Sequence, residues 1–297
     1  MSTVFSCRDF ARSPQRAIPK LGQLLKRGSF CLFLGAGASS GFGLPGWKEL
    51  IARILDKDDD PEFLKELSQR SVRDLDLLLD DIDDGSPAFY EHVHKALYKD
   101  VSPNLSDQLS QSRLLLAIAA LMTGAHRGRI NSVITFNYDD LLEQYLKMLG
   151  LTVCRRLRPD QLSTRADAEI NYVHGNLPQD LVLSALSPTS LVLSRKSYIR
   201  RGAQVDKGWS ARVENVLYSK LGLFVGLSGD DDSMLGTLTR AREQIHRDED
   251  YIGYWILTPD AFARNSKRVA ETGVCPIPLE IPDIPTFLFK TCQAAAR

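Results

Sequence analysis

The chain has 297 residues, of which 43% are hydrophobic, and its basic and acidic side chains are equal in number at 37 each. This length and apolar content suffice for one large domain, or two small ones, with a full core. A formal net charge of zero gives no electrostatic argument for binding nucleic acid or an anionic membrane, so we expect neither.

The cysteines are few and widely spaced, at Cys7, Cys31, Cys154, Cys275 and Cys292. Their odd number and the lack of a C-x-x-C pair argue against a disulfide framework and for a reducing compartment. The first residues lack the apolar core of a signal peptide, and no segment has the roughly 18 apolar residues of a membrane-spanning helix. We therefore predict a cytoplasmic protein.

The first predicted elements are a helix and a buried strand. Apolar residues recur at helical spacing over residues 17–27, and residues 30–34 form the continuous apolar run that is typical of a strand buried on both faces. From 47 to 123 the pattern is mainly helical, with few β-branched residues. We interpret residues 47–123 as a helical insertion, or lid, subdomain.

Strands and helices alternate after this segment. The patterns predict strands at 132–136, 152–157, 170–174, 190–193, 221–227 and 254–257, and helices at 139–149, 209–219 and 232–246. We interpret the proline-rich residues 276–285 as an extended arm. The alternation predicts an α/β fold, a Rossmann-like parallel sheet with helices on both faces, built from residues 1–46 and 124–297. Ligands of such sheets bind at the carboxyl ends of the strands.

A glycine-spaced turn follows the first strand. Residues 30–34 lead directly into Gly35-Ala36-Gly37-Ala38-Ser39. A turn without Cβ atoms lets backbone N–H groups approach a phosphate, although the pattern alone also fits a plain turn.

Further segments in a fixed order favour the functional interpretation. They are Gly43-Leu44-Pro45, Thr135-Phe136-Asn137-Tyr138-Asp139, His174-Gly175 and Phe224-Val225-Gly226-Leu227-Ser228. With the first loop, they resemble the sirtuin-like family of NAD-consuming enzymes, which carries G-A-G-x-S, G-[IL]-P, T-x-N-x-D, H-G and G-x-S elements in this order. The resemblance spans roughly residues 30–240, and it implies that NAD+ is the substrate.

The resemblance also implies which residues form the site. It assigns catalysis to Asn137 and His174, and it places Asp139 beside the nicotinamide carboxamide. It assigns contacts with NAD+ to Gly35, Ala36, Gly37, Ser39, Asp139, Gly226, Ser228 and Asp231.

The polar members of this set also have structural interpretations. Asn137 precedes a predicted helix, where asparagine is a common cap, and Asp139 and Asp231 suit the start of a helix. A lone histidine at a strand end is more often a surface or core residue. The order of the motifs favours function, and an imidazole has the unperturbed pKa nearest neutrality, as a base requires.

One departure from the family concerns zinc. Its deacylase members hold a structural zinc with two C-x-x-C pairs after the H-G step, whereas residues 175–225 here contain no cysteine. We therefore expect no metal site. The chain instead resembles the bacterial antiphage-defence branch, whose members hydrolyse NAD+ outright. This predicts an NAD+ glycohydrolase that releases nicotinamide and ADP-ribose and depletes NAD+.

Two other functions stay open. One is a regulatory module that binds NAD+ or ADP-ribose without turnover, and the other is an ADP-ribosyl transferase or deacylase. The chain has no G-x-x-x-x-G-K motif, so any motor is a separate chain, and the resemblance points to a HerA-like ATPase. Apolar residues of the helical segment, such as Leu75, Leu77, Leu78 and Leu79, predict a homo-oligomer, with completion of a monomer core as the alternative.

Overall fold

A seven-stranded parallel sheet forms the centre of the molecule. The computed structural model describes residues 6–70, 72–124, 129–162, 164–180, 191–246, 249 and 251–297. The strand order is β3-β4-β2-β1-β5-β6-β7, and all neighbouring strands are parallel. The strands are β1 (Phe30–Leu34), β2 (Ser132–Thr135), β3 (Val153–Arg156), β4 (Ala168–Tyr172), β5 (Leu221–Val225), β6 (Gly253–Leu257) and β7 (Val274–Pro278). This confirms the predicted Rossmann-like α/β class.

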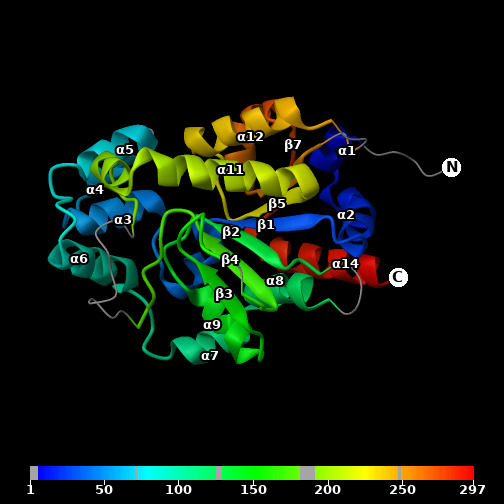
Figure 1. The fold of residues 1–297 in the computed structure, drawn as a ribbon, viewed down its shortest axis with the longest axis horizontal. Coiled ribbons are helices and arrows are strands. Elements are labelled where there is room, and N and C mark those ends of the chain that lie inside the picture. The colour runs from blue at the N-terminus through cyan, green and yellow to red at the C-terminus, as the bar shows by residue number, and fades with distance from the viewer. Residues whose placement is uncertain are drawn as a thin grey trace.

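Helices cover both faces of the sheet (Figure 1). They are α1 (Cys7–Arg12), α2 (Ala17–Lys26), α3 (Trp47–Ile54), α4 (Pro61–Gln69), α5 (Val72–Leu78), α6 (Pro87–Tyr98), α7 (Leu105–Gln111), α8 (Arg113–Thr123), α9 (Leu141–Met148), α10 (Arg195–Arg201), α11 (Ala203–Ser219), α12 (Asp232–Gln244), α13 (Pro259–Glu271) and α14 (Ile284–Ala296). Helices α2, α8, α9 and α14 form a hydrophobic core with one face of the sheet. Helices α11, α12 and α13 form a second hydrophobic core with the other face. None of the described helices is long and apolar enough to cross a membrane.

The central strand β1 is buried on both sides, as its continuous apolar run predicts. Phe30, Leu32 and Leu34 belong to one core cluster, whereas Cys31 and Phe33 belong to the other. Successive side chains of a strand point to opposite faces, so both helical layers are anchored on the same five residues.

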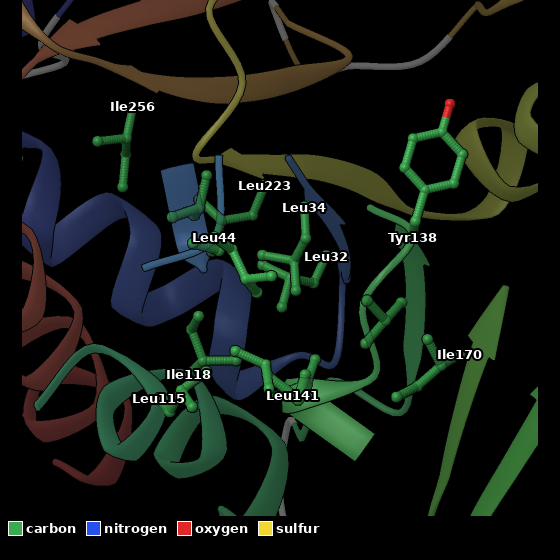
Figure 2. Close-up of a cluster of buried hydrophobic side chains, with 14 of the residues drawn as sticks. Leu32, Leu34, Leu44, Leu115, Ile118, Tyr138, Leu141, Ile170, Leu223 and Ile256 are labelled. Carbon is green, nitrogen blue, oxygen red and sulfur yellow. The ribbon is translucent and has the colours of Figure 1, made fainter. Parts of the chain in front are cut away.

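Helix α8, at the end of the helical segment, lies in the same core as the central strand. Figure 2 shows Leu32 and Leu34 of β1 in a cluster with Leu115 and Ile118 of α8 and Leu141 of α9. Helix α8 also packs against α14. The division of the chain into a sheet domain and a helical subdomain stays a prediction.

The expectation of an extended arm at 276–285 is wrong for its second part: residues 276–278 are in an extended strand, whereas Ile281–Asp283 and the residues from Ile284 on are helical. Strand β7 begins at Val274, and α14 follows from Ile284 with Pro285 in its first turn. Pro276 and Pro278 are tolerated because β7 is an edge strand, where no further strand requires their missing N–H groups. Between them, Ile277 is fully buried.

The strand expected at 190–193 is also wrong over the described part, 191–193, and residue 190 lies outside the described residues. The backbone N–H and carbonyl groups of Val192 form hydrogen bonds outside the sheet. Its N–H donates to the carbonyl of His174 at 2.9 Å, and its carbonyl accepts the Tyr138 hydroxyl at 2.5 Å. The Tyr138 hydroxyl thus supplies the hydrogen bond that the backbone of a neighbouring strand would supply in a sheet.

A disulfide joins the two ends of the chain. Cys7 of α1 and Cys275 of β7 are bonded, with Cα atoms 5.6 Å apart. This bond corrects the expectation from the cysteine spacing, which argues against disulfides. The two cysteines are 268 residues apart, so no local sequence pattern indicates their pairing. The other three cysteines, Cys31, Cys154 and Cys292, are free.

Replacing Cys7 with serine is expected to lower the free energy of unfolding by about 2–4 kcal/mol in oxidising buffer, since the bridge restricts the unfolded chain. Denaturant melts measure this loss, and reductant should reproduce it in the wild type. The matched control is Cys292→Ser, which removes a free thiol. A Cys7→Ser protein as stable as the wild type would contradict the bridge.

Candidate functional site

The sheet changes its direction of growth at β1. After β1 the chain adds β2, β3 and β4 on one side, and then β5, β6 and β7 on the other. The loops that leave β1 and β5 therefore border the topological switch point. Open α/β sheets bind their ligands in the crevice at this point, outside the carboxyl ends of the strands.

Glycines let these two loops touch through their backbones. The Gly35 N–H donates to Val225 O at 3.1 Å, and the Gly37 N–H donates to Gly226 O at 2.9 Å. Gly226 has a φ of +74°, and a Cβ there would lie 2.5 Å from the Ala38 nitrogen. Glycine is needed at 226 for both reasons. The Gly37 N–H is thus held by the second loop in this structure.

A cavity of about 760 Å³ lies at this crevice. Its lining includes all the residues that the sequence places in the site: Gly35, Ala36, Gly37, Ser39, Asn137, Asp139, His174, Gly226, Ser228 and Asp231. The helical segment completes the wall with residues that include Trp47, Leu50, Asp76 and Leu97. The structure therefore brings the ten residues together, and their individual roles stay a prediction.

A short chain of hydrogen bonds fixes the polar centre of the wall. Asn137 Nδ2 donates to Ser39 Oγ at 3.1 Å, and Ser39 Oγ donates to Asp139 Oδ1 at 3.1 Å. All three side chains are buried. Asn137 Oδ1 is left as a buried acceptor with no hydrogen-bond partner among the described residues. A buried acceptor in this condition is costly unless a ligand or water supplies a donor.

The helix-cap interpretation fits Asp139 better than Asn137. Helix α9 begins at Leu141, and the Leu141 N–H donates to Asp139 Oδ1 at 3.1 Å. Asn137 makes no such bond, and its own N–H donates to the Thr135 hydroxyl at 3.1 Å. Burial raises the pKa of Asp139 to about 6, although the bonds from Leu141 and Ser39 oppose this rise.

His174 is partly buried against aromatic rings. Its ring lies 5.4 Å from that of Phe136 and 6.4 Å from that of Tyr198, both edge to face. Burial lowers the pKa of His174 to about 4; the Asp231 carboxylate opposes this shift and the Arg201 guanidinium adds to it. The imidazole is therefore neutral at pH 7 and has a nitrogen lone pair that can accept a proton.

The loop after β5 has a structural role as well as a place in the lining. Asp231 caps α12 by accepting the N–H groups of Ser233 at 2.9 Å and Met234 at 3.2 Å. Ser228 is held through its carbonyl, which accepts Asn265 Nδ2 at 2.9 Å. Asn265, a buried residue of α13 that sequence patterns did not indicate, thereby positions this loop.

Sequence patterns also missed several lining residues. Asp76 comes from α5, Tyr198 from α10 and Arg264 from α13, and no motif marks any of them. Arg264 is the only lysine or arginine among the described lining residues. Trp47 follows the G-L-P turn, its only sequence signal, and its indole N–H is buried without a partner among the described groups.

Within the described ranges, no group of three or more His, Cys, Asp or Glu side chains is arranged to hold a metal ion.

Residues 131–277 match the family model of the SIR2-like domain. The matched segment runs from β2 into β7 and contains Asn137, His174 and the loop after β5, whereas the loop after β1 lies before it. No curated protein matches the chain. The family match supports the sirtuin-like resemblance and fits an NAD-related activity.

Gly226→Ala is expected to cost about 2 kcal/mol or more of stability and to abolish dinucleotide binding, since it adds strain at a positive φ and forces the two loops apart. Thermal melts and calorimetric titration with NAD+ measure the two effects. Gly41→Ala is the matched control, because a Cβ at Gly41 meets nothing within 4 Å. Equal stability and NAD+ affinity in the two variants would refute this account of the loops.

Proposed function

We propose that the protein is an NAD+ glycohydrolase. Water replaces nicotinamide at ribose C1′, giving nicotinamide, ADP-ribose and a proton. The observation that carries the proposal is the shared cavity at the switch point, in which Asn137 and His174 lie beside the two glycine loops. The match to a SIR2-like domain supports NAD+ as the substrate.

Cleavage of NAD+ requires few catalytic groups from the protein. The nicotinamide ring is a cation in NAD+ and departs neutral with the electron pair of the broken C1′–N bond, so no general acid is needed. The ribose passes through an oxocarbenium-like transition state, as in glycoside hydrolysis. The site must therefore hold the ribose and diphosphate in place and guide a water molecule to C1′.

Asn137 suits the task of holding the ribose or the water. Ser39 and Asp139 fix its amide from one side through the hydrogen-bond chain. The free Oδ1 is then available to accept a hydrogen bond from a ribose hydroxyl or from water. A substrate hydroxyl here removes the cost of an unpaired buried acceptor, which favours binding of the correct ligand.

His174 and the two loops suit the remaining tasks. A neutral His174 accepts a hydrogen bond from the ribose hydroxyl or the water, and the surrounding aromatic rings limit access of bulk solvent. The diphosphate belongs near Ser228 and Arg264, because Arg264 is the one positive side chain among the described lining residues.

We further propose that cleavage depletes NAD+ during antiphage defence, and that a homo-oligomer, with a separate HerA-like ATPase, controls the activity. The defence role rests on the sequence resemblance to the zinc-free bacterial branch. The exposed surface of α5 supports self-association. Leu75 and Leu79 are fully buried and complete the core, whereas the Leu77 side chain is 44% exposed.

The activity is tested by incubating the purified chain with NAD+ and measuring nicotinamide and ADP-ribose. Asn137→Ala and His174→Ala are each expected to lower turnover at least about 100-fold without loss of fold, because each removes a group at the reacting centre. His246→Ala, at an exposed histidine outside the cavity, is the control. Binding of NAD+ without cleavage by the wild type would instead support the regulatory module.

The assembly is tested by light scattering on the purified chain. We expect a mass that is a multiple of 33.1 kDa, and we expect Leu77→Asp to reduce it because the charge opposes burial of the α5 surface. Leu162→Asp is the control, at a leucine that is 86% exposed. A monomeric wild type with full turnover would disprove the proposed control by assembly.

A further inference from the structure

Asp76 is a carboxylate that the helical segment contributes to the cavity wall. It lies on α5, outside the segment that matches the SIR2-like domain, and it lines the same cavity as Asn137 and His174. Its side chain is partly buried. Among the described residues, none forms a hydrogen bond or an ion pair with the Asp76 carboxylate, so no structural role accounts for it.

The groups that interact electrostatically with Asp76 come from several parts of the fold. Asp231 at the start of α12 and Asp80 just beyond α5 both act on it with like charge. The charge of Asp76 in turn raises the pKa of Tyr138, after β2, and of Tyr198, in α10, in both cases as a smaller cause than burial. Asp76, Tyr138, Tyr198 and His174 all line the same cavity.

Burial raises the pKa of Asp76 to about 7, and the charges of Asp231 and Asp80 add to this rise. A group with a pKa near the working pH is best suited to take a proton during a reaction. His174, with a pKa of about 4, accepts a hydrogen bond at pH 7 but retains a proton poorly. The two groups thus suit different steps.

We propose that Asp76 is a further catalytic residue, the general base that receives the proton of the attacking water. The inference rests on the proposed NAD+ hydrolysis. The oxygen of water bonds to ribose C1′ as the C1′–N bond breaks, and that electron pair leaves with neutral nicotinamide. The water proton passes to the Asp76 carboxylate and then to solvent. The helical segment thereby supplies part of the reacting centre.

Asp76→Asn tests the role in catalysis. We expect kcat to fall at least about 100-fold while the affinity for NAD+ stays within about threefold, because an amide keeps the shape but accepts no proton. The wild-type kcat should rise with pH through about 7 and then stay constant. The kcat of Asp76→Asn should not show this rise. Asp76→Glu should retain more activity than Asp76→Asn. Asp81→Asn, at an exposed carboxylate after α5, is the control.

A second measurement is independent of turnover. Asp76 is protonated more readily in the folded than in the unfolded chain, so its contribution to stability is fully present below the unfolded pKa, about 4, and is lost as pH rises through about 7. The melting temperature of Asp76→Asn, measured relative to that of the wild type, should therefore increase between pH 4 and pH 8. Asp81→Asn should show no such gain.

The outcomes separate the two proposals. Cleavage by the wild type together with unchanged kcat and pH profile in Asp76→Asn overturns the role of Asp76 and leaves the hydrolase standing. A wild type that binds NAD+ without cleaving it overturns both. A melting difference that does not change with pH places the carboxylate in open solvent and also overturns the inference.

Discussion

The site depends on the backbone contact between the loops that leave β1 and β5. The Gly37 N–H and the Gly226 carbonyl meet across the switch point at 2.9 Å, with no side chain between them. Because each loop continues its own strand, the contact joins the central strand to the half of the sheet built after it. This part of the cavity wall is therefore built on two neighbouring strands of the sheet. Donors and acceptors that are held in position before a ligand binds lower the entropy cost of ordering that ligand.

In the same cavity, burial gives the titratable groups different properties. Asp139 is enclosed and bonded to Ser39 and Leu141, and its pKa of about 6 leaves it mostly ionised at neutral pH. His174 is desolvated by aromatic neighbours, and its pKa falls to about 4. The same desolvation moves the carboxyl and the imidazole in opposite directions, because burial disfavours the charged form of each. The cavity thus holds a fixed anion and a neutral imidazole.

The helical segment closes the cavity from one side while its last helix is anchored beneath the sheet. Trp47 and Asp76 line the cavity, whereas Leu115 and Ile118 of α8 pack in the core with β1 (Figure 2). Leu75 of α5 belongs to the same core cluster as Leu115 and Ile118, so the cavity wall is joined to the core through this helix. Residues 131–277, the matched SIR2-like segment, contain neither this wall nor the first glycine loop, so the complete cavity requires the N-terminal part of the chain.

The sequence by itself determined the class of fold and the position of most of the site. Apolar runs such as 30–34 and 221–225 mark strands buried on both faces, and polar or glycine residues directly after them must lie at the same edge of a parallel sheet. Asn137, His174 and Gly226 could be predicted for this reason. Only the tertiary structure showed that Val274–Pro278 forms the edge strand β7, because prolines in a sequence argue against a strand. Only the tertiary structure showed the bridge between Cys7 and Cys275. It also decided the presence of Asp76 in the cavity, because the packing of α5 sets that position and the spacing of residues along the chain does not.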